Sequence, residues 1–101
     1  MDKISAFQKK FLRGMAHHLE PVVMVGKNGM TKNVLNMTEN ALQSHELIKI
    51  RFIELKDQKK DIAEEISSKT KSEIVGMIGH VAILYRRSPD KKKRKINLPA
   101  K

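Results

Sequence analysis

The sequence predicts an α/β fold, a two-layer sandwich in which helices pack against a mixed four-stranded sheet. Three observations predict it. Apolar residues recur at helical intervals in three stretches, short apolar or alternating runs follow them, and only Gly79 and His80 separate the last two runs. The expected order is α-β-α-β-α-β-β. Strands that alternate with helices form right-handed crossover units, so we expect the first two strands to be parallel neighbours.

The first helix is expected to begin after Ser5, because Gln8 follows it at the spacing of a capping box. It ends before Pro21, since the residue that precedes a proline disfavours the helical conformation. Its apolar residues recur at helical intervals: Phe7, Phe11, Leu12, Met15, Ala16 and Leu19.

The other side of this helix is basic. It carries Lys9, Lys10 and Arg13, and no acid lies between Asp2 and Glu20. We therefore expect these cations to be exposed and unpaired. If Lys27 lies near the helix, the four cations form one positive patch.

A strand, a helix and a second strand follow. The continuous apolar run 22–25 predicts a strand that is covered on both faces. Thr31 is a suitable N-cap for the second helix. The apolar stripe of that helix is Val34, Leu35, Thr38, Ala41, Leu42 and His45. Residues 46–54 alternate, which turns Lys49 and Arg51 away from the apolar face, either to solvent or toward a ligand.

The third helix is expected over residues 57–70, with Ile62, Ala63 and Ile66 facing inward. The apolar runs 74–78 and 81–85 then form an antiparallel hairpin. These two strands complete the four-stranded sheet.

Length and composition limit the class of protein. The 101 residues suffice for one domain, which we place at residues 1–88, followed by a basic, flexible tail at residues 89–101. The absence of cysteine excludes disulfides, zinc–thiolate sites and thiol catalysis. No apolar stretch approaches the roughly 18 residues of a membrane span, and the start lacks the apolar region of a secretory signal. We expect a cytoplasmic monomer that needs no membrane.

The net charge is +10, and residues 87–101 hold seven of the 21 basic residues and one acid. A polybasic segment on a mildly basic domain indicates a polyanionic partner, either nucleic acid or, less often, a membrane surface.

The segment Gly26-Lys27-Asn28-Gly29 joins a predicted strand to a predicted helix. It is either a plain turn, since Asn-Gly is a common turn pair, or an anion site at the start of a helix. The spacings of a Walker loop and of a dinucleotide fingerprint are both absent. KH domains clamp RNA backbone with a Gly-x-x-Gly loop, although there it joins two helices.

Three sequence blocks carry a family resemblance. They are LRGMAHHLEPVVMVGKNGMT (12–31), HELIKI (45–50) and VAILYR (81–86). Together they resemble the CRM domain, named for chloroplast RNA splicing and ribosome maturation, over residues 5–88. The length and the ending RKINLP (94–99) look like the bacterial stand-alone members, the YhbY-like proteins.

The resemblance implies an RNA-binding domain whose fold is similar to the C-terminal domain of translation initiation factor 3. It also implies association with ribosomal RNA and with precursors of the large ribosomal subunit. The family's glycine loop falls on Gly26, Lys27, Asn28 and Gly29, and its basic helix face on Lys9, Lys10 and Arg13. We add Thr31, Lys49 and Arg51 to the expected RNA-binding residues. His80 stands where many relatives carry Lys or Arg.

No arrangement of residues indicates catalysis, a metal or a cofactor. His17 and His18 are consecutive, so on a helix they point about 100° apart and share an ion poorly. His45 is better explained by packing or capping, and the acids of the third helix lie on its polar face.

Two functional hypotheses remain. The first is a non-catalytic protein that binds ribosomal RNA during large-subunit assembly through the glycine loop and a basic face. The second is a general polyanion or membrane-surface binder that acts through the polybasic tail.

Overall fold

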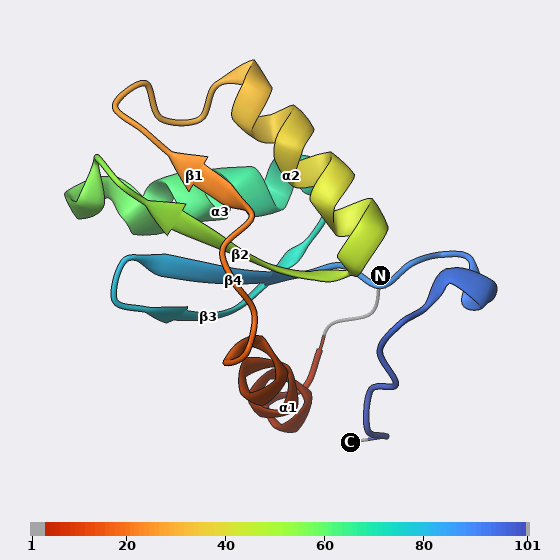
Figure 1. The fold of residues 1–101 in the computed structure, drawn as a ribbon. Coiled ribbons are helices and arrows are strands. Elements are labelled where there is room, and N and C mark those ends of the chain that lie inside the picture. The colour runs from red at the N-terminus through yellow and green to blue at the C-terminus, as the bar shows by residue number, and fades with distance from the viewer. Residues whose placement is uncertain (1–3, 101) are drawn as a thin grey trace.

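The computed structural model describes residues 4–100. The helices are α1 (Ala6–Ala16), α2 (Lys32–His45) and α3 (Lys59–Thr70), and the strands are β1 (Val23–Val25), β2 (Leu47–Phe52), β3 (Glu73–Ile78) and β4 (Val81–Tyr85). Single 3₁₀ turns lie at Lys56–Gln58 and Lys91–Lys93. The predicted α-β-α-β-α-β-β order is confirmed (Figure 1).

The strands form one mixed sheet in the order β1-β2-β4-β3. Strands β1 and β2 are parallel, with Val25 opposite Phe52, and the other two pairs are antiparallel. The predicted sheet and its parallel first pair are therefore confirmed. Because β2 runs from Leu47 to Phe52, the turn after β1 lies at one end of the sheet and Tyr85 at the other.

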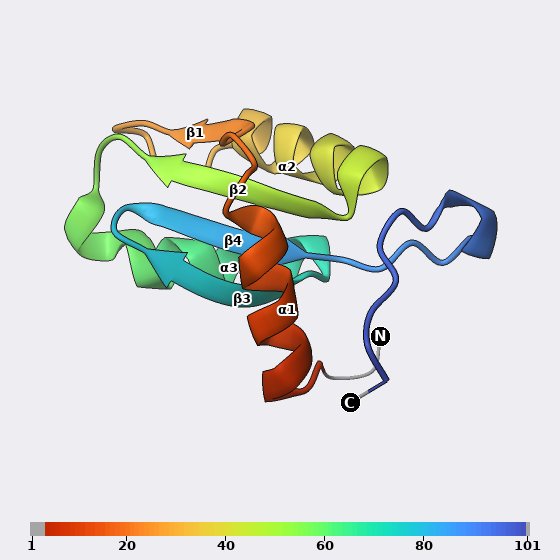
Figure 2. The same cartoon turned by 60° about the horizontal axis from the view of Figure 1, so that its bottom comes forward.

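Helices α2 and α3 cover one face of the sheet (Figures 1 and 2). The buried cluster between these helices and the sheet draws side chains from both layers. They are Val34 and Leu42 from α2, Ala63 and Ile66 from α3, and Ile48, Ile50, Phe52, Ala82 and Leu84 from the sheet. This side of the molecule is the two-layer sandwich that the sequence predicts.

Helix α1 lies on the opposite face and crosses the strands in Figure 2. Leu12 and Ala16 pack there against Leu47, Ile83 and Tyr85. The two-layer description thus holds for the α2–α3 side only, and α1 adds a third layer. The physical reason is β4, whose side chains are buried on both faces and so need cover on both.

The apolar residues predicted for the first helix are largely outside the core. Phe7, Phe11, Met15 and Leu19 are between 39% and 55% exposed, whereas Leu12 and Ala16 are fully buried. The helix is therefore rotated toward its basic side, and Arg13 is partly covered rather than exposed and unpaired as expected. Its Nη1 donates to the Val75 carbonyl at 2.8 Å.

The C-terminal segment folds back onto the domain. Ile96 is buried in the cluster beneath α1, and the Gln8 side chain donates to the Pro99 carbonyl at 2.8 Å. The buried Glu46 carboxylate accepts hydrogen bonds from the backbone N–H groups of Ser88 (2.6 Å) and Lys95 (2.7 Å). The segment through Pro99 thus differs from the flexible tail that the sequence predicted, because an apolar side chain and a carboxylate anchor it.

Candidate nucleic-acid interface

The glycine loop is a tight turn at the end of β1. The Gly29 N–H donates to the Gly26 carbonyl at 3.0 Å, which places Lys27 and Asn28 at the tip. Both tip residues are exposed. Neither side chain forms a hydrogen bond with another described residue, so both can reach a ligand.

The two glycines have different roles. Gly29 is buried, its φ is +69°, and an added Cβ would lie 3.3 Å from Leu55 Cδ1. The turn therefore requires glycine at this position. Gly26 is exposed, and an added Cβ would meet nothing within 4 Å. The fold therefore does not require glycine there, and the position has room for a side chain.

Thr31 fixes the start of α2, as predicted. Its Oγ1 accepts a hydrogen bond from the Val34 N–H at 3.1 Å, and its own N–H donates to the Gly29 carbonyl at 3.0 Å. The first turn of α2 contains no acidic residue. The positive end of the helix dipole therefore lies beside the turn, and the first turn of the helix itself holds no carboxylate that would neutralise it.

Strand β2 presents Lys49 and Arg51 on the α1 side of the sheet, where they are not covered by α2 and α3. The Lys49 Nζ donates to the Leu19 carbonyl at 3.0 Å, and Arg51 is exposed opposite Met24 of β1. Both residues line a groove of about 330 Å³, together with His17, Leu19, Glu20, Pro21, Ile78, Val81 and Ile83. The structure thus brings together two cations that the sequence placed on one face of a strand.

The cations of α1 do not join Lys27 in one patch. Arg13 contacts β3, at one edge of the sheet, while the turn that carries Lys27 follows β1 at the other edge. Lys9 is half-buried, and Lys10 lines a shallow hollow beside the exposed Phe7 and Phe11. The condition for a single four-cation patch, a position of Lys27 near the first helix, is therefore not met, because the strand order separates the turn from Arg13.

Lys59 is a further cation at the end of the sheet that carries the glycine turn, and the sequence pattern did not predict it. Its Nζ donates to the Gly79 carbonyl and lies 3.3 Å from Nδ1 of His80. The His80 carbonyl in turn accepts the Phe52 N–H at 2.8 Å, and Phe52 pairs with Val25 just before the turn. Only the tertiary fold brings the start of α3 to this hairpin, so no local sequence signal could have found the contact.

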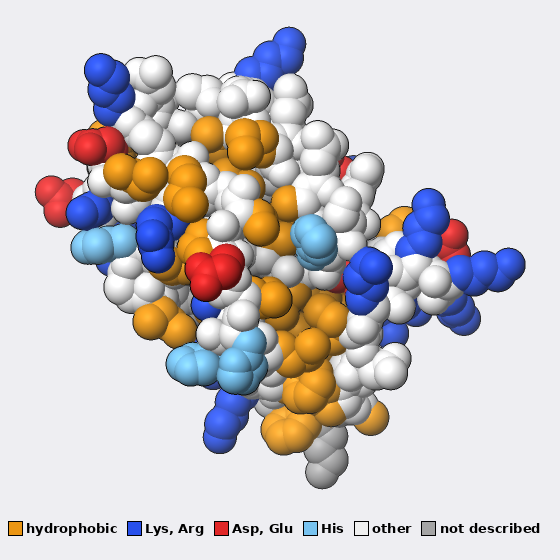
Figure 3. Space-filling view, viewed as in Figure 1, with side chains coloured by type: hydrophobic (Ala, Val, Ile, Leu, Met, Phe, Trp, Pro, Cys, Tyr) orange, Lys and Arg blue, Asp and Glu red, His pale blue; other side chains and the backbone are white. Residues whose placement is uncertain are grey.

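The charge distribution is uneven over the face seen in Figure 3. Basic side chains gather at the end near the turn, with acidic ones among them, and again over the C-terminal segment. Hydrophobic side chains occupy the region between, over α1.

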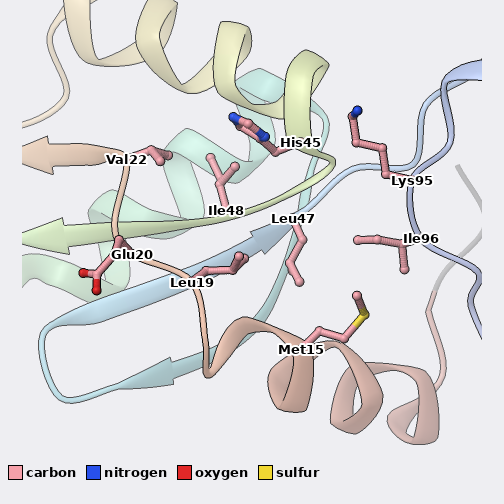
Figure 4. Close-up of a pocket in the computed structure, with 9 residues that line it drawn as sticks. All are labelled: Met15, Leu19, Glu20, Val22, His45, Leu47, Ile48, Lys95 and Ile96. Carbon is pink, nitrogen blue, oxygen red and sulfur yellow. The ribbon is translucent and has the colours of Figure 1, made fainter.

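An apolar hollow of about 390 Å³ lies between α1, β2 and the C-terminal segment (Figure 4). Met15, Leu19, Leu47 and Ile96 surround it, while His45 sits above them at the end of α2. Because its lining is mainly apolar, this hollow does not extend the basic groove.

Residues 4–100 show neither a candidate metal site nor a helix that could span a membrane. In this range no group of three or more His, Asp or Glu side chains could hold a metal ion. None of the helices described here has both the length and the apolar character needed to cross a bilayer.

The CRS1/YhbY (CRM) domain model matches residues 4–86. The chain belongs to the CRM family. A Haemophilus influenzae protein named as an RNA-binding protein is similar to it over the whole of both chains, with 47% identity across 102 residues. YqeI of Bacillus subtilis, named as a probable RNA-binding protein, is 39% identical over 93 residues, which cover 91% of this chain and 95% of YqeI.

A solved structure has the same CRM-type fold. The solution structure of the hypothetical protein SAV1595 from Staphylococcus aureus matches with a TM-score of 0.82 and 35% identity, over 96% of this chain and all of that one. The family resemblance drawn from the three sequence blocks is thereby confirmed.

Proposed function

We propose that this CRM-domain protein binds RNA without catalysing a reaction. The observation that carries the proposal is the turn at residues 26–29. Its tip offers the Lys27 ammonium and the Asn28 amide, the position of Gly26 is open, and the N-terminus of α2 adds positive potential. The names of the relatives from Haemophilus influenzae and Bacillus subtilis support RNA as the ligand.

The groove on the sheet extends this interface. An RNA strand whose phosphate contacts the turn can continue over Arg51 and Lys49, because all three lie along β1 and β2 on or beside the α1 side of the sheet. Phosphate contacts of this kind give affinity but do not identify bases. We therefore expect the turn and groove to recognise the path of the RNA backbone.

The RNA is, on this proposal, ribosomal, and the protein acts as a cytoplasmic monomer on precursors of the large ribosomal subunit. This finer statement rests on the family resemblance of the sequence. A protein that binds one RNA conformer better than another shifts the population toward that conformer. Such a shift is enough for an assembly role and needs no active site.

The test is Gly26→Asp, which adds a negative charge where the fold has room for a side chain. We expect the affinity for structured large-subunit RNA to fall about tenfold, on the scale of a lost charge-assisted hydrogen bond, while the melting temperature stays the same. Asn40→Asp adds the same charge at an exposed position in the middle of α2 and serves as the matched control.

Two outcomes would overturn the proposal. Equal RNA affinity of the Gly26→Asp variant and the wild type would reduce the loop to a turn. Binding to anionic vesicles as tight as to RNA would favour the general polyanion or membrane-surface binder instead.

A further inference from the structure

A cavity of about 650 Å³ lies at the end of the sheet opposite the glycine loop. It is open to solvent on one side and is lined by the start of α1, the end of β4 and the C-terminal segment. Four of its described lining residues are cationic, namely Lys71, Arg86, Arg87 and Arg94, and none of the described ones is acidic. The six-residue strand β2 separates this cavity from the loop, a distance of roughly 15–20 Å.

The C-terminal segment forms a wall of this cavity because Glu46 holds it in place. The Glu46 carboxylate accepts the N–H groups of Ser88, Lys95 and Ile96. The Arg94 Nε then donates to the Ser88 carbonyl at 2.8 Å, which fixes the guanidinium at the cavity wall. A cation that is fixed in this way binds an anion with less ordering cost than one on a flexible tail does.

The positive charge of the cavity is only partly neutralised. Arg86 forms a two-point ion pair with Glu39 at 2.8 Å. Among the described residues, Lys71, Arg87 and Arg94 have no carboxylate partner. An unpaired group of three cations favours an anion of more than one charge.

Tyr85 also lines the cavity. The side chain is fully buried, and its Oη has no hydrogen-bond partner in the part of the chain that the structure describes. Burial raises the pKa of this phenol, the Glu46 carboxylate raises it further, and Arg87 and Arg94 act in the opposite direction. The hydroxyl therefore keeps its proton at neutral pH, and no described residue accepts a hydrogen bond from it.

We propose that this cavity binds a phosphate monoester carried by a nucleotide. A terminal phosphate carries about −1.5 to −2 charges at pH 7, and its oxygens match the forked donors of arginine. The cavity volume lies within the roughly 300–1,000 Å³ of small-molecule sites, which leaves room for the nucleoside. Two sources share this chemistry, a free mononucleotide and the phosphorylated end of an RNA strand, and only the second rests on the proposed function.

Calorimetry and amide NMR with AMP as the probe test the cavity by itself. AMP should bind and shift the amide signals of Tyr85 and Arg87, whereas adenosine should not. Arg87→Gln combined with Lys71→Gln should lower the AMP affinity about tenfold or more, which corresponds to about 1.4 kcal/mol. Lys60→Gln removes an exposed charge from α3 and should have no effect.

Tyr85→Phe separates binding from folding. Because the hydroxyl has no partner, its loss should leave the melting temperature unchanged or raise it, while the AMP affinity falls severalfold. Equal AMP affinity of the wild type and the cavity variants, or no AMP binding by the wild type, would overturn the proposal for the free nucleotide.

The RNA source is tested with one oligoribonucleotide carrying either a 5′-phosphate or a 5′-hydroxyl. The wild type should prefer the phosphorylated strand about tenfold. Arg87→Gln should remove that preference, whereas Gly26→Asp should weaken both strands and keep it. Equal binding of the two strands by the wild type would exclude the RNA source and leave the proposed function intact. If neither strand binds but AMP does, the result would contradict the proposed function and leave the nucleotide cavity intact.

Discussion

Arg13, which the sequence predicted to be exposed, packs against the sheet and contributes to the fold. Its Nη1 donates to the Val75 carbonyl, and its methylene groups lie over Gly76, where an added Cβ would be 2.6 Å from Arg13 Cδ. The absence of a side chain at position 76 lets α1 approach the sheet on this side. The main role of Arg13 is therefore to stabilise the position of α1 on the sheet.

Gly76→Ala should lower the free energy of unfolding by about 1–3 kcal/mol, because the added methyl group overlaps the Arg13 side chain. The matched control is Gly14→Ala in α1, where an added Cβ meets nothing within 4 Å. That change should raise the stability by about 0.5–1 kcal/mol, since alanine favours the helix. Urea unfolding of the two variants gives both signs, and equal effects would contradict this account of Gly76.

The Glu39–Arg86 ion pair gives the stability a dependence on acid. Hydrogen bonding to Arg86 lowers the pKa of Glu39 from its usual 4.5, against a smaller opposing effect of burial. A lowered folded-state pKa means that the contribution is present above pH 4.5 and is lost as the pH falls through the lower value.

Glu39→Gln should therefore flatten the stability profile below pH 4.5 and leave the slope near neutral pH unchanged. Urea midpoints measured from acid to neutral pH check this. Parallel profiles for the variant and the wild type throughout the acid range would show that the pair contributes nothing to it.

At the scale of the elements, local signals predicted what local interactions determine. The capping box of Ser5 and Gln8 and the N-cap at Thr31 are present as predicted. The third helix begins at Lys59 rather than at residue 57, because a 3₁₀ turn precedes it. Periodicity alone could not identify the side of α1 that docks on the sheet. Which apolar residues of the helix become buried, here Leu12 and Ala16, depends on the shape of the sheet beneath them.

The C-terminal segment could not have been predicted for the same reason. Nothing in the charged stretch at residues 91–95 indicates that Ile96 enters the core or that Glu46 binds the segment through three N–H groups. The same limit applies to the candidate interface. Alternation placed Lys49 and Arg51 on one face, but the contact between Lys59 and His80 depends on the tertiary fold.

Glu46→Gln should lower the free energy of unfolding by about 1–3 kcal/mol, because an amide oxygen replaces a buried carboxylate that accepts three N–H groups. Amide hydrogen exchange should accelerate most at Ser88, Lys95 and Ile96. Glu54→Gln removes an exposed acid as the control and should change neither quantity. Unchanged protection at these three amides would mean that Glu46 does not hold the segment.

At the scale of the whole molecule, the net charge of +10 is distributed over separate surfaces. The turn and groove occupy one part of the sheet, and the exposed lysines 91–93 extend from the anchored C-terminal segment. A long RNA can contact both, whereas a short strand can contact only one. The contribution of each surface should therefore depend on the length of the RNA.

Replacing Lys91, Lys92 and Lys93 by glutamine should weaken binding to a long structured RNA and reduce its salt dependence. Each lost phosphate contact lowers the logarithmic slope by about 0.7–0.9. Point substitutions are the correct test, because deletion of the segment would also remove the buried Ile96. Affinities measured over a range of salt concentrations decide it, and an unchanged slope would show that the RNA does not contact these lysines.

The anchored segment also affects the order in which the nascent chain can fold. Among the described residues, the buried cluster beneath α2 and α3 contains none after Leu84, whereas the cluster beneath α1 includes both Ile4 and Ile96. Synthesis runs from the N-terminus, so α1 emerges first but obtains its complete contact surface last. Until Ile96 has left the ribosome, α1 remains without part of its core, and the cavity beside Tyr85 has no C-terminal wall. A chain released before that residue would present a finished α2–α3 half with an incomplete opposite face.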